Sequence, residues 1–170
     1  FTGQRIACAL YVNEILFHSL PSQHPYQELF HLYAQLLVAL EQVSPDLLDI
    51  KLRIFEKQML SLLGYHYNFT VTCHDEAVEQ NKMYHFIPGQ GLVVATASLK
   101  QAITHHTKYA KHAHEHFFTS FTGQALLSIA HDDFAEKTTR QQAKYIMRAA
   151  IQHLIGYKIL KSRKLFVSHN

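Results

Sequence analysis

The stretch "LLDIKLRIFEKQMLSLLGY", from Leu47 to Tyr65, decides the fold class. Apolar residues fill so many of its positions that a helix formed here has little polar face, which is typical of the central helix of a bundle. Ser44 is placed as its N-cap, with Pro45 and Asp46 in the first turn. Gly64 suits the left-handed position after the last turn. We therefore predict a mainly α-helical bundle around this helix.

The segments upstream have the same helical character. Pro25 stands at a good first helical position, and apolar residues then recur at helical spacing to about Gln42. Residues from Thr2 to Leu20 show one broad apolar face without an internal proline, and Pro21 stops that helix. Two helices are thus expected to precede the central one.

The region after the central helix changes pattern. Between Tyr65 and Ser98, two β-favouring runs, 84–87 and 92–95, flank a Pro-Gly-Gln-Gly turn, which predicts a β-hairpin. Such a hairpin needs the helices to pack on, because an isolated one is marginal in water. Further on, "TGQALLSIA" predicts a short amphipathic piece. A longer helix is expected from about Thr139 to Ile155, closed by Gly156, and a last short one at Ser162 to Val167.

Length and composition limit the classes of protein. The 170 residues suffice for one ordinary domain, which we expect to span residues 1–170 with 65–98 as a hairpin-containing subregion. The two cysteines, Cys8 and Cys73, form no disulfide framework or four-thiolate zinc pattern. No apolar run is long enough for a membrane span. We expect a soluble protein of a reducing cytosol and, since the first residue is Phe1, a piece of something longer.

Positive charge is concentrated at the C-terminal end. The 34 residues from Lys137 to Asn170 hold 8 of the 16 Lys and Arg residues and no Asp or Glu. The preceding part of the chain has a net charge of −5 and this end has +8. An asymmetry of this kind indicates an anionic partner, because cations without counter-ions repel one another. The alternative is a solvated helix face without a partner.

Seven of these cations are our candidate DNA-binding residues. Lys137, Arg140, Lys144 and Arg148 follow one stripe of the expected long helix, and the segment after the helix can continue the cationic surface. The predicted set is Arg140, Lys144, Arg148, Lys158, Lys161, Arg163 and Lys164.

Arg53 is the other notable cation, because it stands on the very apolar central helix. One interpretation is an ordinary surface pair with Asp49 or Glu56. The other is that Arg53 lies at the rim of an apolar groove, where it clamps a carboxylate of a partner bidentately. Aromatic side chains such as Tyr11, Phe55 and Tyr157 would then stack near the groove or belong to the core.

Metal binding and catalysis find little support. The chain has 14 histidines, including a run with His105, His106, His112, His114 and His116, which is more typical of a polar helix face than of a metal site. His74, Asp75 and Glu76 beside Cys73 form a second loose cluster. There is no Gly-rich phosphate loop and no nucleophile elbow. We predict a protein that is not an enzyme and has no cofactor.

Four segments resemble, in order and spacing, the bacterial DNA repair protein family RecO. They are "YVNEIL" at Tyr11, "ELFHLYAQLLVAL" at Glu28, "LRIFEKQMLSLLGY" at Leu52 and "GYKILKSRKLF" at Gly156. The resemblance covers nearly the whole chain and corresponds to the helical C-terminal portion of the family, without its N-terminal OB-fold domain.

The resemblance implies a recombination mediator of the bacterial cytoplasm, associated with the nucleoid. Members bind single- and double-stranded DNA, anneal complementary strands and, with RecR, help load RecA onto DNA coated by single-strand-binding protein (SSB). They also recognise the acidic, Phe-ending C-terminal tail of SSB. By resemblance to "LRIFE", Arg53 is expected to contact the tail carboxylate, together with Lys57.

One departure concerns zinc. Many members carry four zinc-binding cysteines around the hairpin, whereas this chain keeps Cys73 and lacks the second pair expected at residues 95–98. We therefore expect no zinc and a hairpin held by packing. The alternative function is a protein-interaction module only, with DNA binding located in a missing N-terminal domain.

Overall fold

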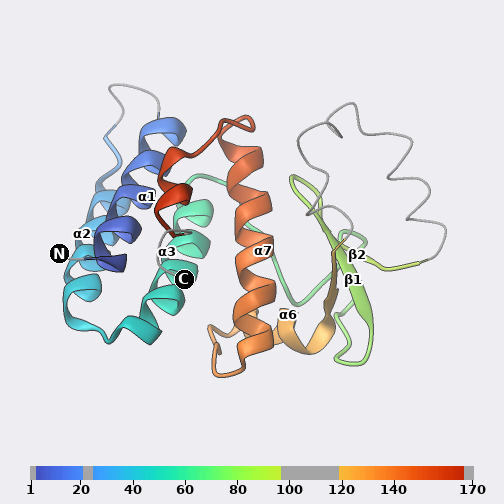
Figure 1. Ribbon diagram of the computed structural model, residues 1–170. Helices are drawn as coiled ribbons and strands as arrows, with labels where there is room; N and C mark the ends of the chain where they lie inside the picture. The colour runs from blue at the N-terminus through green and yellow to red at the C-terminus, as the bar shows by residue number, and fades with distance from the viewer. Residues whose placement is uncertain (1–2, 21–24, 97–118, 167–170) are drawn as a thin grey trace. The chain divides into compact units, whose positions relative to one another are not determined.

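The computed structural model describes residues 3–20, 25–96 and 119–166, which form two compact units. Unit 1 comprises the chain up to Tyr65 and from Ile151 onward, and unit 2 comprises residues 66–150. The predicted mainly α class with a small β insertion is confirmed (Figure 1). The histidine run from His105 to His116 lies outside the described residues.

Unit 1 is built on three helices that lie side by side (Figure 1). They are α1 (Gln4–Ser19), α2 (Gln27–Gln42) and α3 (Leu48–Leu62), the last preceded by the 3₁₀ turn η1 (Pro45–Leu47). These are the three helices predicted from periodicity. The fully buried side chains between them are aliphatic and aromatic, among them Ile15, Leu40, Phe55, Met59 and Leu60.

The two ends of α3 differ in how well the sequence predicted them. Gly64 has a φ of 88°, the left-handed conformation expected of it after the helix. Ser44 is the N-cap residue of η1, with Pro45 and Asp46 after it as predicted, but its side chain makes no capping hydrogen bond. The chain instead enters through η1, where the Leu47 amide donates to the Ser44 carbonyl at 3.0 Å.

The C-terminal segment of unit 1 packs on α1. The last predicted helix is present, but as the 3₁₀ helix η2 (Lys161–Phe166), and Val167 lies outside the described residues. Leu160 and Ser162 are buried, and the Phe166 ring meets the Tyr11 ring edge-on with centroids 5.9 Å apart. The first helix and the C-terminal segment of the chain are therefore packed together within unit 1.

Unit 2 contains a three-stranded antiparallel sheet of order β2-β1-β3. The hairpin of β1 (Met83–Ile87) and β2 (Gly91–Val94) is the predicted one, with Tyr84 opposite Val94 and Ile87 opposite Gly91. The third strand, β3 (Ser120–Thr122), was not predicted, because three residues are too few to show alternation. The Tyr67 ring meets the Phe86 ring at 4.8 Å, so packing supports the hairpin.

Two helices follow β3 in the sequence. The short amphipathic piece is α6 (Gly123–Ala130), where Thr122 Oγ1 accepts a capping hydrogen bond from the Ala125 amide at 3.2 Å. The predicted long helix is α7 (Lys137–Leu154), whose buried stripe includes Ala143, Ile146, Met147 and Ala150, as expected. Gly156 follows with a positive φ of 64°. Within the described ranges, no helix combines the length and apolar character needed to cross a membrane.

Candidate functional site

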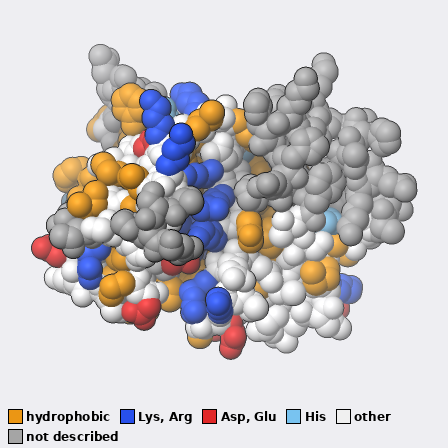
Figure 2. All heavy atoms as spheres, in the orientation of Figure 1, with side chains coloured by type: hydrophobic (Ala, Val, Ile, Leu, Met, Phe, Trp, Pro, Cys, Tyr) orange, Lys and Arg blue, Asp and Glu red, His pale blue; other side chains and the backbone are white. Residues whose placement is uncertain are grey.

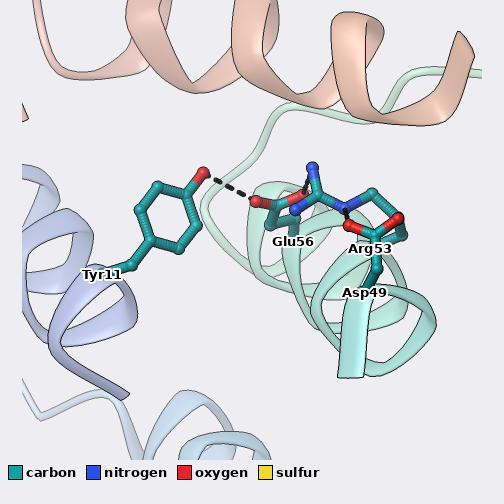
Figure 3. A network of polar contacts seen from close by, with 4 residues as sticks. All are labelled: Tyr11, Asp49, Arg53 and Glu56. Atoms are coloured by element: carbon teal, nitrogen blue, oxygen red, sulfur yellow. Dashed lines mark hydrogen bonds and ion pairs between the residues drawn. The ribbon is translucent and has the colours of Figure 1, made fainter. Parts of the chain in front are cut away.

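The Arg53 guanidinium lies inside unit 1, in a network of charged and polar groups (Figure 3). Its Nη1 is 2.7 Å from Glu56 Oε2, and its Nε is 3.6 Å from Asp49 Oδ1. Tyr11 reaches across from α1 and donates its hydroxyl hydrogen to Glu56 Oε1 at 2.7 Å. Arg53 is 3% exposed and Glu56 is 0% exposed, so the ion pair is removed from solvent.

Burial controls the ionisation of the groups in this network. It disfavours the charged form of Arg53, but the neighbouring acidic groups, Glu56 first and Asp49 among them, together more than offset this and raise the pKa of Arg53. Burial, with the charge of Glu56, also raises the pKa of Tyr11. The buried Cys8 thiol has its pKa raised to about 11, again because of desolvation. Tyr11 and Cys8 therefore stay neutral near pH 7.

The position of Arg53 differs from both interpretations of its sequence context. The pair with Asp49 and Glu56 exists, but it is buried, so an ordinary surface pair is a wrong description. A direct clamp on a partner's carboxylate would have to compete with Glu56 for the guanidinium. Lys57, the next residue on α3, is half-buried and has an interaction partner of its own. The role of Arg53 and Lys57 in peptide binding stays a prediction.

The aromatic candidates belong mostly to the core. Tyr11 is 4% exposed and Phe55 is 2% exposed, so neither ring offers a face to a ligand. Tyr157 is half-buried, has a positive φ of 59° and lies with its ring centroid 6.4 Å from that of His153. Core packing is thus the role of two of the three rings.

Glu14 links α1 to the C-terminal segment, a contact that sequence analysis missed. Its Oε1 accepts a hydrogen bond from the Lys161 amide at 2.8 Å, and its Oε2 accepts from the Ser162 amide at 2.8 Å and from the Ser162 hydroxyl at 2.5 Å. Burial opposes ionisation of Glu14, but the hydrogen bonds from Ser162 and Lys161 prevail and lower the pKa of its carboxyl. No local pattern could reveal a contact between residues so far apart in sequence.

The lysines of the C-terminal segment are exposed. Lys158, Lys161 and Lys164 all point to solvent, and Figure 2 shows Lys and Arg side chains gathered over this segment. Among the residues that the structure describes, Lys158 and Lys161 form no ion pair with a carboxylate. Three of the seven predicted DNA-binding residues therefore present their charge on the surface of the C-terminal segment.

The predicted arginines are placed differently from the lysines. Arg140 donates from Nη1 to the carbonyls of Phe134 at 2.7 Å and Ala135 at 2.8 Å, which ties the loop before α7 to the helix. Arg163 is half-buried, with Nε and Nη2 shielded from solvent. Arg148, like Lys144, is half-exposed on α7 and has an interaction partner. Arg140 and Arg163 thus have structural surroundings that the sequence did not indicate.

Comparison with known proteins identifies the family. The model of the family described as "Recombination protein O C terminal" matches residues 1–164. This chain belongs to that family. Proteins named DNA repair protein RecO are similar to it: one from Coxiella burnetii (strain CbuG_Q212) is 29% identical over 96% of this chain. Others from Actinobacillus pleuropneumoniae serotype 3 and Psychromonas ingrahamii are 36% identical over 92% and 32% identical over 98% of it.

The chain spans only part of these RecO relatives. It covers 62% of the Coxiella protein, 58% of the Actinobacillus protein and 64% of the Psychromonas protein. The predicted correspondence to the C-terminal portion of RecO is confirmed by the family match. What the whole relatives do is therefore not automatically a property of this portion.

The four segments quoted for their resemblance to RecO all lie in unit 1, although the family match itself covers residues 1–164. They supply Tyr11 and Glu14 from α1, Arg53 and Glu56 from α3, and Ser162 from η2. These are the residues whose side chains contact one another in the two polar clusters described above. The resemblance thus marks the residues that hold the helices and the C-terminal segment together.

The loop before the hairpin, where the sequence predicts no zinc, is held by hydrogen bonds, and the absence of zinc stays a prediction. Cys73 is exposed, and its amide donates to the Leu92 carbonyl at 2.7 Å. Thr72 Oγ1 accepts hydrogen bonds from the amides of His74 and Glu76, and Val71 pairs with Ala77. In the part of the chain that the structure covers, no three His, Cys, Asp or Glu side chains group as metal ligands. Backbone hydrogen bonds hold the loop.

Proposed function

We propose that this chain is the C-terminal portion of a recombination mediator in DNA repair, which binds DNA through the lysines of its C-terminal segment. The observation that carries the proposal is the exposure of Lys158, Lys161 and Lys164 on a segment without carboxylates, in a chain of the RecO family. Clustered exposed cations neutralise phosphates and release counter-ions, which supplies most non-specific affinity for nucleic acid.

The first test measures DNA binding. A labelled single strand should bind the unsubstituted chain at 50 mM salt and lose affinity steeply as salt rises. The double variant Lys158→Ala/Lys161→Ala should bind at least about tenfold more weakly and shift the slope of log K against log salt by about 1.4, since each phosphate contact contributes about 0.7. Lysines are chosen because replacing the half-buried Arg163 would also disturb packing.

A charge-matched variant provides the control. Lys51→Ala/Lys82→Ala removes two cations elsewhere, one from α3 and one from an exposed pair with Glu79. It should bind DNA nearly as tightly as the unsubstituted chain. Equal weakening of DNA binding by both double variants would show that only the net charge of the protein matters. If the unsubstituted chain shows no salt-sensitive DNA binding, the alternative function as a protein-interaction module is favoured.

We also propose that unit 1 binds the acidic, Phe-ending tail of SSB. Such a tail requires apolar surface for its aromatic residue and cations for its carboxylates. Unit 1 exposes apolar side chains, including Phe17 and Phe30 with 80% and 67% of their surfaces accessible. Lys57 is the cation of the predicted pair that reaches the surface of α3.

The tail proposal is tested on Lys57 rather than on Arg53. The Lys57→Ala variant should bind an SSB-tail peptide about fivefold more weakly, the effect of losing one charge-assisted contact. Lys51→Ala is the matched control, because Lys51 lies on the same helix, is similarly half-buried and points about 120° away around the helix axis. Fluorescence anisotropy with the labelled peptide measures both. Equal peptide affinities for the two variants would show that Lys57 does not contribute to the binding site.

The remaining activities in this proposal involve partners. Together with RecR, the protein would assist strand annealing and the loading of RecA on DNA coated by SSB. Each of these steps is binding and positioning, so the proposal includes neither a catalytic residue nor a cofactor.

A further inference from the structure

The carboxylate of Glu14 lies at the N-terminal end of η2, the segment that carries the exposed Lys161 and Lys164. The first backbone amides of a helix have no hydrogen-bond acceptor within it. At η2, Glu14 accepts hydrogen bonds from two of these amides, those of Lys161 and Ser162, and a third from the Ser162 hydroxyl. The contact joins α1 to a segment about 147 positions further along the chain. Nothing local in the sequence would order this segment in the same way.

The geometry of η2 decides which side chains this contact orders. In a 3₁₀ helix, side chains three residues apart lie in line, about 6 Å apart along the axis. Lys161 and Lys164 have this spacing and are both exposed, while Ser162 is buried at 7% exposure and Phe166 packs against Tyr11. The contacts that hold η2 on α1 therefore aim the two lysines to the same side.

We propose that Glu14 is a positioning residue for DNA binding: by holding the N-terminal end of η2, it keeps Lys161 and Lys164 ordered before DNA arrives. The proposal rests on the proposed DNA-binding function. Pre-ordering saves the entropy that flexible side chains and backbone lose on binding. It also places a negative charge at the positive end of the helix dipole, where it offsets the repulsion among the lysines.

The proposal predicts a change in DNA affinity opposite in direction to the change expected from charge alone. If Glu14 acted only through its charge, removing a carboxylate next to lysines would strengthen binding of a polyanion. If it acts by positioning, the same change weakens binding although the protein becomes more positive. The direction of the change in affinity therefore separates the two roles.

The experiment compares single-strand DNA affinity of the folded 170-residue chain and three variants. Glu14→Ala should bind about tenfold more weakly, because η2 would then lose conformational entropy when DNA binds. Ser162→Ala removes one of the three hydrogen bonds without a change of charge, and should weaken binding about two- to threefold. Glu41→Ala, which removes an exposed carboxylate of α2, should leave affinity unchanged or slightly increase it.

Hydrogen exchange gives an independent measure of the same contact. The amides of Lys161 and Ser162 should exchange faster in Glu14→Ala than in the unsubstituted chain, while those in the middle of α3 keep their protection. If Glu14→Ala fails to fold, Ser162→Ala alone decides the question through its affinity.

Two results would overturn the inference. One is a folded Glu14→Ala variant that binds DNA as tightly as the unsubstituted chain or more tightly. The other is unchanged affinity in Ser162→Ala despite faster exchange at Lys161. Either result leaves the proposed function intact if Lys158→Ala/Lys161→Ala still binds weakly, whereas absence of DNA binding by the unsubstituted chain refutes the proposed function itself.

Discussion

Replacing Arg53 with alanine is expected to lower the free energy of unfolding by about 3–5 kcal/mol, the usual cost of removing one partner of a buried ion pair. The reason is that Glu56, which is 0% exposed and also accepts a hydrogen bond from Tyr11, would lose its 2.7 Å partner Arg53. Urea denaturation followed by far-UV circular dichroism measures the change.

Neighbouring variants show whether the buried pair causes the effect. Asp49→Ala should cost less than about 1 kcal/mol, because the side chain of Asp49 is 40% exposed and lies 3.6 Å from Arg53. Tyr11→Phe should cost about 1.5–3 kcal/mol, the value of a hydrogen bond to a charged group. A midpoint for Arg53→Ala equal to that of Asp49→Ala would contradict the assignment of a buried, essential ion pair.

This stability effect also limits how peptide binding is interpreted. Loss of SSB-tail binding in Arg53→Ala would follow from a disturbed α3 even if the guanidinium never contacts the peptide. Lys57 is only half-buried, so a Lys57→Ala variant that keeps the stability of the unsubstituted chain but binds the peptide more weakly has lost a binding contact. The two variants together separate a structural role from a binding role.

The second large effect is expected for Gly123→Ala, which should destabilise unit 2 by at least about 3 kcal/mol, the upper end of the range for overpacking. A Cβ atom at Gly123 would lie 1.9 Å from the Glu79 carbonyl oxygen and 2.7 Å from its carbon. Both atoms are backbone, so a simple rotation of a side chain cannot relieve the clash.

The surroundings of Gly123 make adjustment costly. Its amide donates to the Lys82 carbonyl at 2.8 Å, and the Gln124 amide donates to the Gln80 carbonyl at 3.1 Å, so the start of α6 is bound to the 79–82 turn. The Glu79 amide in turn donates to the Tyr84 hydroxyl oxygen at 2.8 Å. Moving the turn away from an added methyl group would break these bonds.

Two controls rank the effect of Gly123→Ala. Gly64→Ala meets open space but requires a non-glycine residue at a φ of 88°, which costs about 1–2 kcal/mol. Gln124→Ala, at the next and exposed position of α6, should change stability by less than about 0.5 kcal/mol. Thermal unfolding of the three variants checks the order, and a Gly123→Ala variant as stable as Gln124→Ala would show that the turn can shift freely.

The charge asymmetry drew attention to the C-terminal segment, but it could not separate lysines from arginines. Arg140 binds the Phe134 and Ala135 carbonyls, Arg53 binds Glu56, and Arg5 binds the Leu40 and Val43 carbonyls. The planar guanidinium serves several fixed acceptors at once, whereas an ammonium on a flexible stem remains hydrated. The exposed lysines are therefore the better candidates for phosphate contacts.

Local pattern alone determined the helices of this protein, the hairpin, the glycine after α3 and the cationic C-terminal segment, because each depends on residues close together in the chain. The family resemblance followed from four short segments. Only the tertiary structure decided that Arg53 is buried with Glu56 and that Glu14 holds η2 on α1. Those contacts join distant residues, and whether a charge faces water or a partner depends on what packs around it, which periodicity does not encode.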